Sequence, residues 1–189
     1  MTKVLIVYGS AYGQTTRIAR RFADRLEENG IHTVVVNGAT LPPEIQMEQF
    51  DGFVVAGSVR YGRHQRYLEK FVRQYHGGFG HRPSAFISVC GAMSSKQPEG
   101  AVEARKYRLA FFKRTGWSPQ FDQSFAGGLP YTQYGVLTRM MMKAISRRTG
   151  GPVDTSRDWD FTDWKQVDQF ALDFAHALVG SVPAALVHA

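Results

Sequence analysis

The chain has 189 residues, of which 43% are hydrophobic and 21% charged, and these proportions exclude a largely disordered or fibrous protein. The formal net charge of +7 favours anionic partners such as anionic lipid or an acidic small molecule. We exclude nucleic acid as a partner because no basic motif is interleaved with aromatic residues.

Three features of the sequence indicate the cellular compartment. No apolar run approaches the roughly 20 residues of a membrane-spanning helix, and the N-terminus enters a strand pattern without the layout of a signal peptide. The single cysteine, Cys90, excludes an internal disulfide. These features predict a cytoplasmic protein.

The first two thirds of the chain alternate apolar, β-branched runs with segments whose apolar residues recur at helical spacing. In chain order the predicted strands and helices are 4–8, 18–26, 33–36, 53–56, 67–75, 85–89 and 101–112. Such alternation predicts an α/β fold with a doubly wound parallel sheet.

The last third departs from this alternation. Residues 125–129 are predicted as a short fifth strand, but the terminal helix begins only after residues 162–164. An insertion of about residues 131–160 separates the two. We therefore expect one domain over residues 1–178, followed by a flexible tail, 179–189.

The loop after the first strand carries the strongest functional signal. Its residues 9–16 read Gly-Ser-Ala-Tyr-Gly-Gln-Thr-Thr and precede a helix, whose N-terminal amides and dipole favour an anion. Ser10, Thr15 and Thr16 add hydroxyl donors, and Gly13 allows close approach of the backbone. The alternative is that these hydroxyls only cap the helix.

Two phosphate-binding motifs are excluded for this loop. It lacks the Gly-Lys-Ser/Thr ending of a nucleoside triphosphate loop, and it is not G-x-G-x-x-G. The second strand is followed by Asn37 and Gly38, not by an acid that would bind a ribose. A monophosphate site of amides and hydroxyls remains, which is the arrangement expected for FMN.

Two more loops follow neighbouring strands and are expected at the same edge of the sheet. The loop that starts at Ser58 contains Tyr61, which is placed to stack on a flavin ring, and the loop that starts at Cys90 would close over its other side. We interpret Cys90 as a small buried residue and His64 as a solvated turn residue. The six histidines show no metal-ligand spacing, so no metal is predicted.

Residues 134–148, within the insertion, form an amphipathic helical pattern with Leu137 and Met141 on one side and Arg139, Lys143 and Arg147 on the other. It is interpreted either as an ordinary packed helix or as a surface that contacts anionic lipid or substrate carboxylates.

With these residues identified, the chain resembles the bacterial quinone-dependent protoporphyrinogen IX dehydrogenases, which belong to the long-chain flavodoxin-like superfamily. The resemblance runs from Val4 to about Leu178. Its segments are Tyr12 to Thr15, Ser58 to Gly62, Pro83 to Phe86, Gly150 and Gly151 with Asp154 and Thr155, and Thr162 to Trp164. The family often has an acid where Tyr12 stands, and its insertion is richer in arginine and aromatic residues.

The resemblance implies a flavodoxin-like five-stranded sheet with an insertion in the fifth-strand region, an FMN cofactor, a porphyrinogen substrate and menaquinone or ubiquinone as acceptor. It places the protein peripherally on the cytoplasmic face of the inner membrane. The cofactor-binding residues would be Ser10, Ala11, Tyr12, Gly13, Gln14, Thr15, Ser58, Val59, Arg60, Tyr61, Gly62, Val89, Cys90, Gly91 and Ala92.

The implied reaction oxidises protoporphyrinogen IX to protoporphyrin IX for haem biosynthesis, with the chemistry at the flavin N5 and no catalytic side chain assigned. Two alternatives stay open: an NAD(P)H:quinone reductase and an electron-transfer flavodoxin, although such carriers are usually acidic. A phosphoacceptor receiver domain is disfavoured because Gly57 stands where it needs an aspartate. The oligomeric state is left open.

Overall fold

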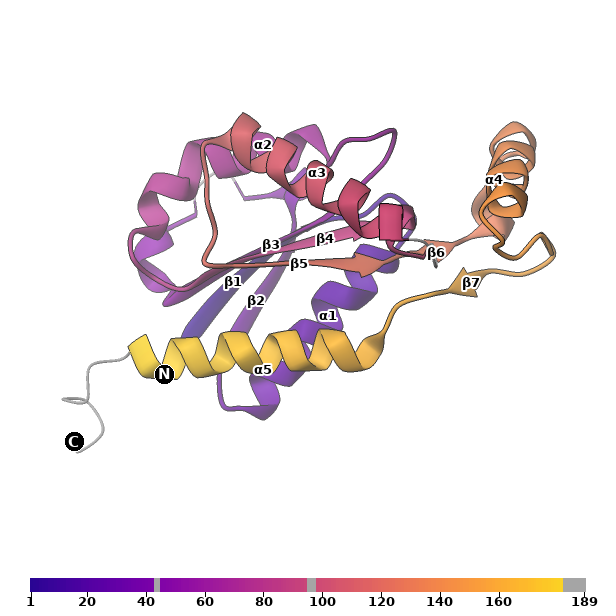
Figure 1. Ribbon diagram of the computed structural model, residues 1–189. Helices are drawn as coiled ribbons and strands as arrows, with labels where there is room; N and C mark the ends of the chain where they lie inside the picture. Colours follow the sequence, from indigo (N-terminus) through magenta and orange to yellow (C-terminus); the bar gives the residue numbers. More distant parts are fainter. Residues whose placement is uncertain (43–44, 95–97, 182–189) are drawn as a thin grey trace.

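Five parallel strands form the central sheet of this computed structural model, which describes residues 1–42, 45–94 and 98–181 (Figure 1). They are β1 (Lys3–Gly9), β2 (His32–Asn37), β3 (Gly52–Ser58), β4 (Ser84–Cys90) and β5 (Phe121–Ala126), in the order β2-β1-β3-β4-β5. Every neighbouring pair is parallel, so the five carboxyl ends lie at one edge. The predicted doubly wound flavodoxin-like sheet is confirmed.

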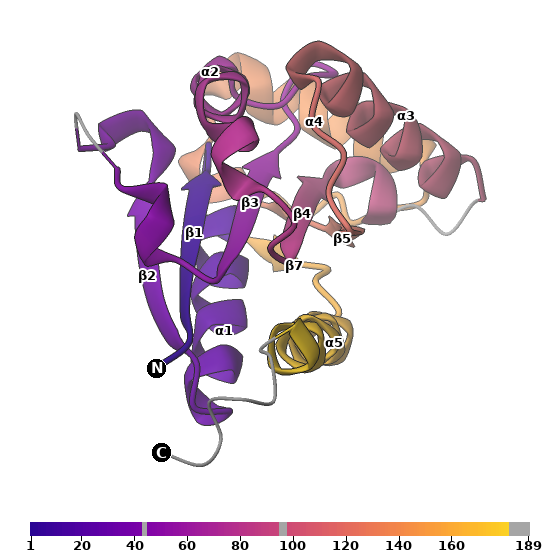
Figure 2. The same cartoon turned by 90° about the vertical axis from the view of Figure 1, so that its left-hand side faces the viewer.

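Helices cover both faces of this sheet (Figure 2). They are α1 (Gln14–Glu28) and α5 (Trp164–Ser181) on one face, and α2 (Arg66–Tyr75) and α3 (Pro98–Thr115) on the other. Short 3₁₀ turns connect some of the elements: η1 (Gly38–Thr40), η2 (Met47–Gln49), η3 (His76–Phe79) and η4 (Gly91–Ser94). All seven residues of β4 are buried, because helices exclude water from both of its sides.

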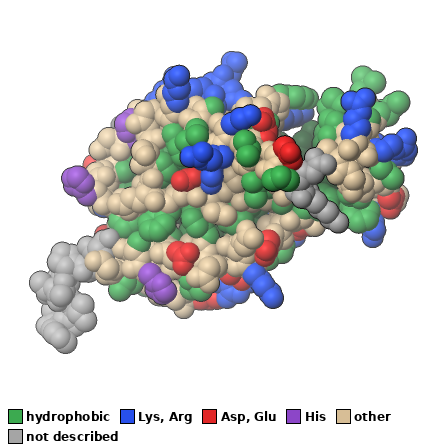
Figure 3. Space-filling model, in the orientation of Figure 1, with side chains coloured by type: hydrophobic (Ala, Val, Ile, Leu, Met, Phe, Trp, Pro, Cys, Tyr) green, Lys and Arg blue, Asp and Glu red, His purple; other side chains and the backbone are tan. Residues whose placement is uncertain are grey.

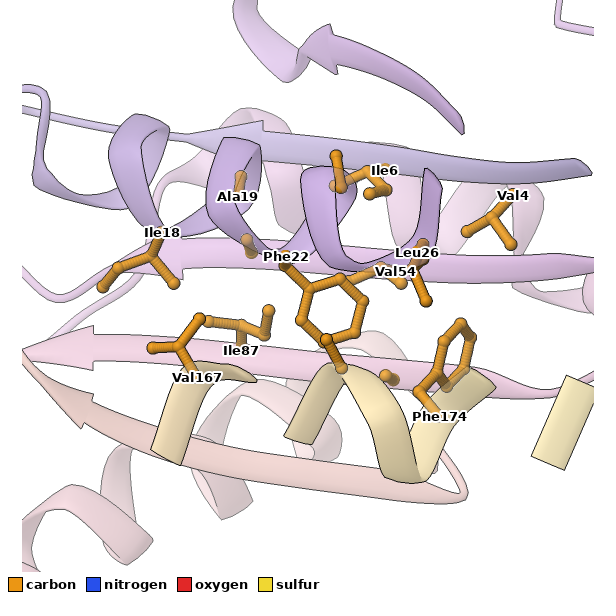
Figure 4. Packing of buried hydrophobic residues seen from close by; sticks show 14 of the residues in the cluster. Val4, Ile6, Ile18, Ala19, Phe22, Leu26, Val54, Ile87, Val167 and Phe174 are labelled. Carbon is orange, nitrogen blue, oxygen red and sulfur yellow. The ribbon is translucent and has the colours of Figure 1, made fainter. Parts of the chain in front are cut away.

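Two apolar clusters hold these layers together. In the first, Phe22 of α1 is fully buried and lies 5.9 Å, centroid to centroid, from Phe174 of α5 (Figure 4). In the second, Phe86 of β4 stacks on Phe111 of α3 at 4.5 Å. Large aromatic side chains on each face thus fix the helices against the sheet and, with them, the loops at its carboxyl edge.

The insertion begins directly after β5 and forms a small unit of its own. Strands β6 (Gly128–Leu129) and β7 (Trp159–Asp160) pair antiparallel, and between them lie η5 (Tyr131–Gln133) and α4 (Val136–Arg148). Helix α4 stands clear of the two helical layers (Figure 1).

The predicted bounds of the fifth strand, 125–129, were wrong. Strand β5 begins at Phe121, and residues 128–129 belong to the hairpin. Asp122 and Gln123 concealed the strand, because at the edge of the sheet polar residues are tolerated where a central strand is apolar. Helix α5 reaches Ser181, and residues 182–189 of the predicted tail lie outside the described residues.

An ion pair ties α1 to α5 beside the first cluster. Arg21 donates to both carboxylate oxygens of Asp168 at 2.6 and 2.7 Å, and Arg25 donates at 3.0 Å. The hydrogen bond from Arg21, opposed by burial and aided by Arg25, lowers the pKa of Asp168 to about 2. The folded state therefore favours the ionised carboxylate.

We expect the Asp168→Asn variant to be less stable than the parent protein above about pH 4, where the unfolded carboxyl is ionised as well. Because the folded pKa is the lower one, this difference should shrink as the pH falls from about 4 towards 2. Urea denaturation of both proteins across this range measures it. A difference that is independent of pH would contradict the assignment.

Candidate functional site

A cavity of about 830 Å³ opens at the carboxyl edge of the sheet. All fifteen residues named from the sequence for the three loops line it. The structure thus brings together segments after β1, β3 and β4, as parallel strands require. It also adds walls that the sequence did not indicate, including Tyr107 of α3 and Tyr134, Met141 and Trp159 of the insertion.

The loop from β1 to α1 presents unpaired donors to this cavity. Gly13 precedes α1 with φ of 89°, and no side chain caps the helix, so the amides of its first turn have no partner within the helix. The hydroxyl of Thr15 is buried and lacks a hydrogen-bond partner among the described residues. These donors fit an anionic oxygen ligand such as a phosphate.

Ser10 shapes this loop, because its hydroxyl accepts a hydrogen bond from the amide of Gly13 at 2.9 Å. The alternative interpretation, in which hydroxyls only cap the helix, does not account for Thr15, whose side chain makes no cap hydrogen bond. The side chain of Gln14 is engaged elsewhere: its amide donates to Asp160 and Thr162.

The loop after β3 forms a tight turn at the rim of the cavity. Arg60 and Arg63 exchange two backbone hydrogen bonds of 2.9 and 3.2 Å, and the two residues between them, Tyr61 and Gly62, have φ of 50° and 75°. Left-handed backbone at both central positions matches a type I′ turn. Tyr61 is 80% exposed, and the guanidinium of Arg60 lies over its ring.

The prediction that His64 is a solvated turn residue was wrong. His64 is buried, and its Nε2 lies 2.9 Å from the hydroxyl of Ser88 on β4. Burial, aided by the charge of Arg114, lowers its pKa to about 3, so the ring is neutral. A Cβ at Gly57 would lie 3.1 Å from this ring, which explains the small residue at that position of β3.

The buried carboxylate of Glu69 fixes the loop after β3 on the far side of the turn at Tyr61 and Gly62. Glu69 pairs with Arg63, which follows the turn, and with Arg114 of α3 at 2.7 Å. Burial alone would raise the pKa of Glu69, but the hydrogen bonds from the two arginines outweigh it and lower the pKa. Cys90, at the end of β4, is buried as expected, and burial raises the pKa of its thiol.

Helix α4 is not an ordinary packed helix. Its apolar side chains stay exposed, with Leu137 at 83% and Met140 at 66%, and Figure 3 shows them beside basic side chains. Met141 and Ile145 extend the same surface into the wall of the cavity. Of the three cations named from the sequence, Arg139 donates to the backbone carbonyls of Tyr131 and Tyr134, so it anchors the helix.

Within the described part of the chain, no helix has both the length and the apolar character needed to cross a membrane.

Comparisons with known proteins agree with this geometry. Residues 5–156 match the family described as flavodoxin domain. The chain is 34% identical over 174 residues to the protoporphyrinogen IX dehydrogenase [quinone] of Escherichia coli K12, covering 92% of this chain and 95% of that protein. It is 31% identical over 182 residues to the protein of that name from Leishmania major, covering 96% and 78%.

Solved structures support the fold alone. A flavodoxin from an archaeon superposes with a TM-score of 0.54 at 13% identity, covering 94% of this chain and 99% of that one. The C101A mutant of flavodoxin from Pseudomonas aeruginosa gives 0.56 at 18% identity, covering 95% and 100%.

The buried His64 generates a testable pH dependence. Between about pH 6.5 and 3 the imidazole of His64 is protonated in the unfolded chain but stays neutral in the folded protein. Lowering the pH through this range therefore reduces the free energy of unfolding. From pH 7 to pH 5 the parent protein should lose about 2 kcal/mol more than the His64→Gln variant. Denaturant unfolding measures this difference. The exposed His176→Gln variant should behave as the parent does, and equal losses in all three proteins would refute a neutral buried His64.

Proposed function

The chain belongs to the family of quinone-dependent protoporphyrinogen IX dehydrogenases with a flavodoxin domain, and we propose that it binds FMN and oxidises protoporphyrinogen IX with a quinone as acceptor. The flavodoxin domain implies a flavin cofactor. Choosing FMN rests on one observation above the others: the first turn of α1 has no side-chain cap, and beside it the hydroxyl of Thr15 has no hydrogen-bond partner among the described residues.

Different segments of the cavity wall would bind the phosphate and the ring of FMN. The amides of the first turn of α1, with the hydroxyls of Ser10 and Thr15, would hold the phosphate. The turn at Tyr61 and the segment Val89 to Ala92 would hold the ring from two sides. The phosphate loop needs no cation or metal for this, because backbone dipoles and hydroxyls supply the donors.

When bound, FMN supplies the two-electron redox chemistry of the reaction. The chain's own contribution is to bind, to orient and to exclude water. His64 stays neutral beneath the turn of Tyr61, and Glu69 holds that turn through Arg63. We assign no side chain as a proton donor or acceptor.

The exposed side of α4 is where we place the large apolar substrates. Met141 and Ile145 join its surface to the cavity, so a tetrapyrrole or a quinone bound there would reach the cofactor. Lys143 and Arg147 lie on the same helix and would pair with substrate propionates or with anionic lipid at the cytoplasmic face of the inner membrane. Arg139 would act indirectly, by fixing α4.

Two rival functions predict different electron donors. An NAD(P)H:quinone reductase would have its flavin bleached by NAD(P)H, and an electron-transfer flavodoxin would oxidise neither compound at a useful rate. We expect anaerobic mixing to show bleaching by protoporphyrinogen IX and none by NAD(P)H. Bleaching by NAD(P)H alone would overturn the proposed substrate.

Removing the hydroxyl of Thr15 should weaken FMN binding. Thr15→Val keeps the shape of the side chain but leaves a phosphate oxygen without its donor, a loss of about 1.5–3 kcal/mol for a charged partner, or roughly 10- to 150-fold in Kd. Quenching of flavin fluorescence measures the Kd. Thr40→Val, at an exposed position on η1, is the matched control. Equal affinity of both variants would place the phosphate elsewhere.

Charge reversal on α4 tests its proposed contacts. If α4 contacts lipid, Lys143→Glu combined with Arg147→Glu should weaken binding to anionic vesicles by about 25-fold or more, because each cation near the surface contributes roughly 1 kcal/mol. If the substrate propionates are the partner, the same double variant should raise the KM for the porphyrinogen. Arg105→Glu with Lys106→Glu on α3 serves as a control of equal charge. Unchanged vesicle binding and unchanged KM together would refute the contacts.

A further inference from the structure

The insertion is joined to the phosphate loop by a small polar network. The side-chain amide of Gln14 donates to Asp160 at 2.8 Å and to Thr162 at 2.6 Å. Arg17, one turn further along α1, pairs with the other carboxylate oxygen of Asp160 at 3.1 Å and donates to Gln14 at 3.0 Å. Side chains from the start of α1 therefore hold β7, which closes the insertion.

The receiving side of this network is itself fixed to the sheet. Thr162 donates its hydroxyl to the carbonyl of Ala126 at the end of β5, at 3.0 Å, and its amide donates to Asp160. The backbone of Gly128 in β6 lies close to β7 and to Gln14, since a Cβ at Gly128 would lie 2.8 Å from the carbonyl of Trp159 and 3.6 Å from the side-chain oxygen of Gln14. The hairpin base, α1 and β5 thus meet where the phosphate loop ends.

A second contact joins the same two parts by different residues. Tyr12, in the middle of the phosphate loop, packs edge to face on Tyr134 of the insertion, with ring centroids 5.0 Å apart. Tyr134 is 7% exposed, and burial raises its pKa to about 12. Arg60 lies over the other ring, that of Tyr12, at 5.2 Å, so the turn after β3 joins the contact.

The rest of the insertion offers little to fix its position. Strands β6 and β7 have two residues each, and a ribbon of that size is not stable in water by itself. The apolar side of α4 is exposed. Its placement over the cavity therefore depends on the Tyr12–Tyr134 contact and on the contacts at the hairpin base, to which the first turns of α1 contribute Gln14 and Arg17.

We propose that Gln14, Arg17 and Asp160 form a latch through which occupation of the phosphate loop fixes the position of the insertion over the cavity. This inference rests on the proposed binding of FMN. A phosphate held by the first turn of α1 immobilises the backbone that carries Gln14 and Arg17, and through them β7. Since coupling between two sites is reciprocal, a fixed insertion also favours the bound cofactor, and Asp160 is a positioning residue for the substrate-facing helix.

Hydrogen exchange of the insertion, with and without FMN, tests the latch. In the parent protein, FMN should slow amide exchange across residues 129–160 by about tenfold, within the usual range of coupling, and riboflavin, which lacks the phosphate, should slow it less. In Asp160→Ala the effect of FMN on the insertion should fall to what the Tyr12–Tyr134 contact alone transmits. Asp24→Ala removes the same charge from an exposed position of α1 and should keep the full effect.

The outcomes separate the latch from the cofactor assignment. If flavin fluorescence is quenched, so that FMN is bound, but exchange in the insertion of the parent protein is unchanged, the latch is wrong and the proposed function stands. Full FMN protection in Asp160→Ala, or equal protection by riboflavin, overturns the latch as well. If FMN does not bind the parent protein at all, both proposals fall.

Discussion

A helix that starts without a capping side chain, after the loop that follows a buried strand, is the constraint on which the rest of this structure depends. Among the described residues no side chain caps the first turn of α1 and the hydroxyl of Thr15 has no hydrogen-bond partner, and such groups cost free energy unless water or a ligand satisfies them. The sheet fixes where they point, because β1 lies between β2 and β3. This arrangement supports the proposed phosphate site.

The loops around this site differ in how firmly they are held. The turn at Tyr61 is followed by the neutral, buried His64 and is held by Glu69, whose carboxylate pairs with two arginines. These contacts keep its left-handed backbone in place. The insertion is joined to the domain at its base and exposes apolar side chains beyond it. The proposed cofactor site is thus held more firmly than the apolar helix beside it, which fits the proposal that a large apolar substrate binds at α4.

The sequence predicted the parallel sheet and its three carboxyl-edge loops well, because buried strands flanked by glycine are local signals. It could not place His64, whose burial depends on Ser88 and on Phe86 and Phe111, which are distant in the chain. Strand β5 was misplaced because its polar residues resemble a loop.

Walls from the insertion escaped prediction for the same reason as His64. Tyr134 and Asp160 reach the cavity through contacts with Tyr12 and Gln14, which lie more than a hundred residues earlier in the chain, and no periodicity within the insertion signals such pairs. The aromatic side chain of Tyr12 was the one sequence feature of this loop that could have indicated an aromatic partner.

The structure of the FMN-loaded protein, solved by crystallography, is the most direct test of the proposed site. We expect the phosphate to be hydrogen-bonded to Thr15 and to the first-turn amides of α1, with the ring between the turn at Tyr61 and the segment that follows Val89. Density for FMN at any other surface, or a phosphate that leaves Thr15 without a partner, would contradict it.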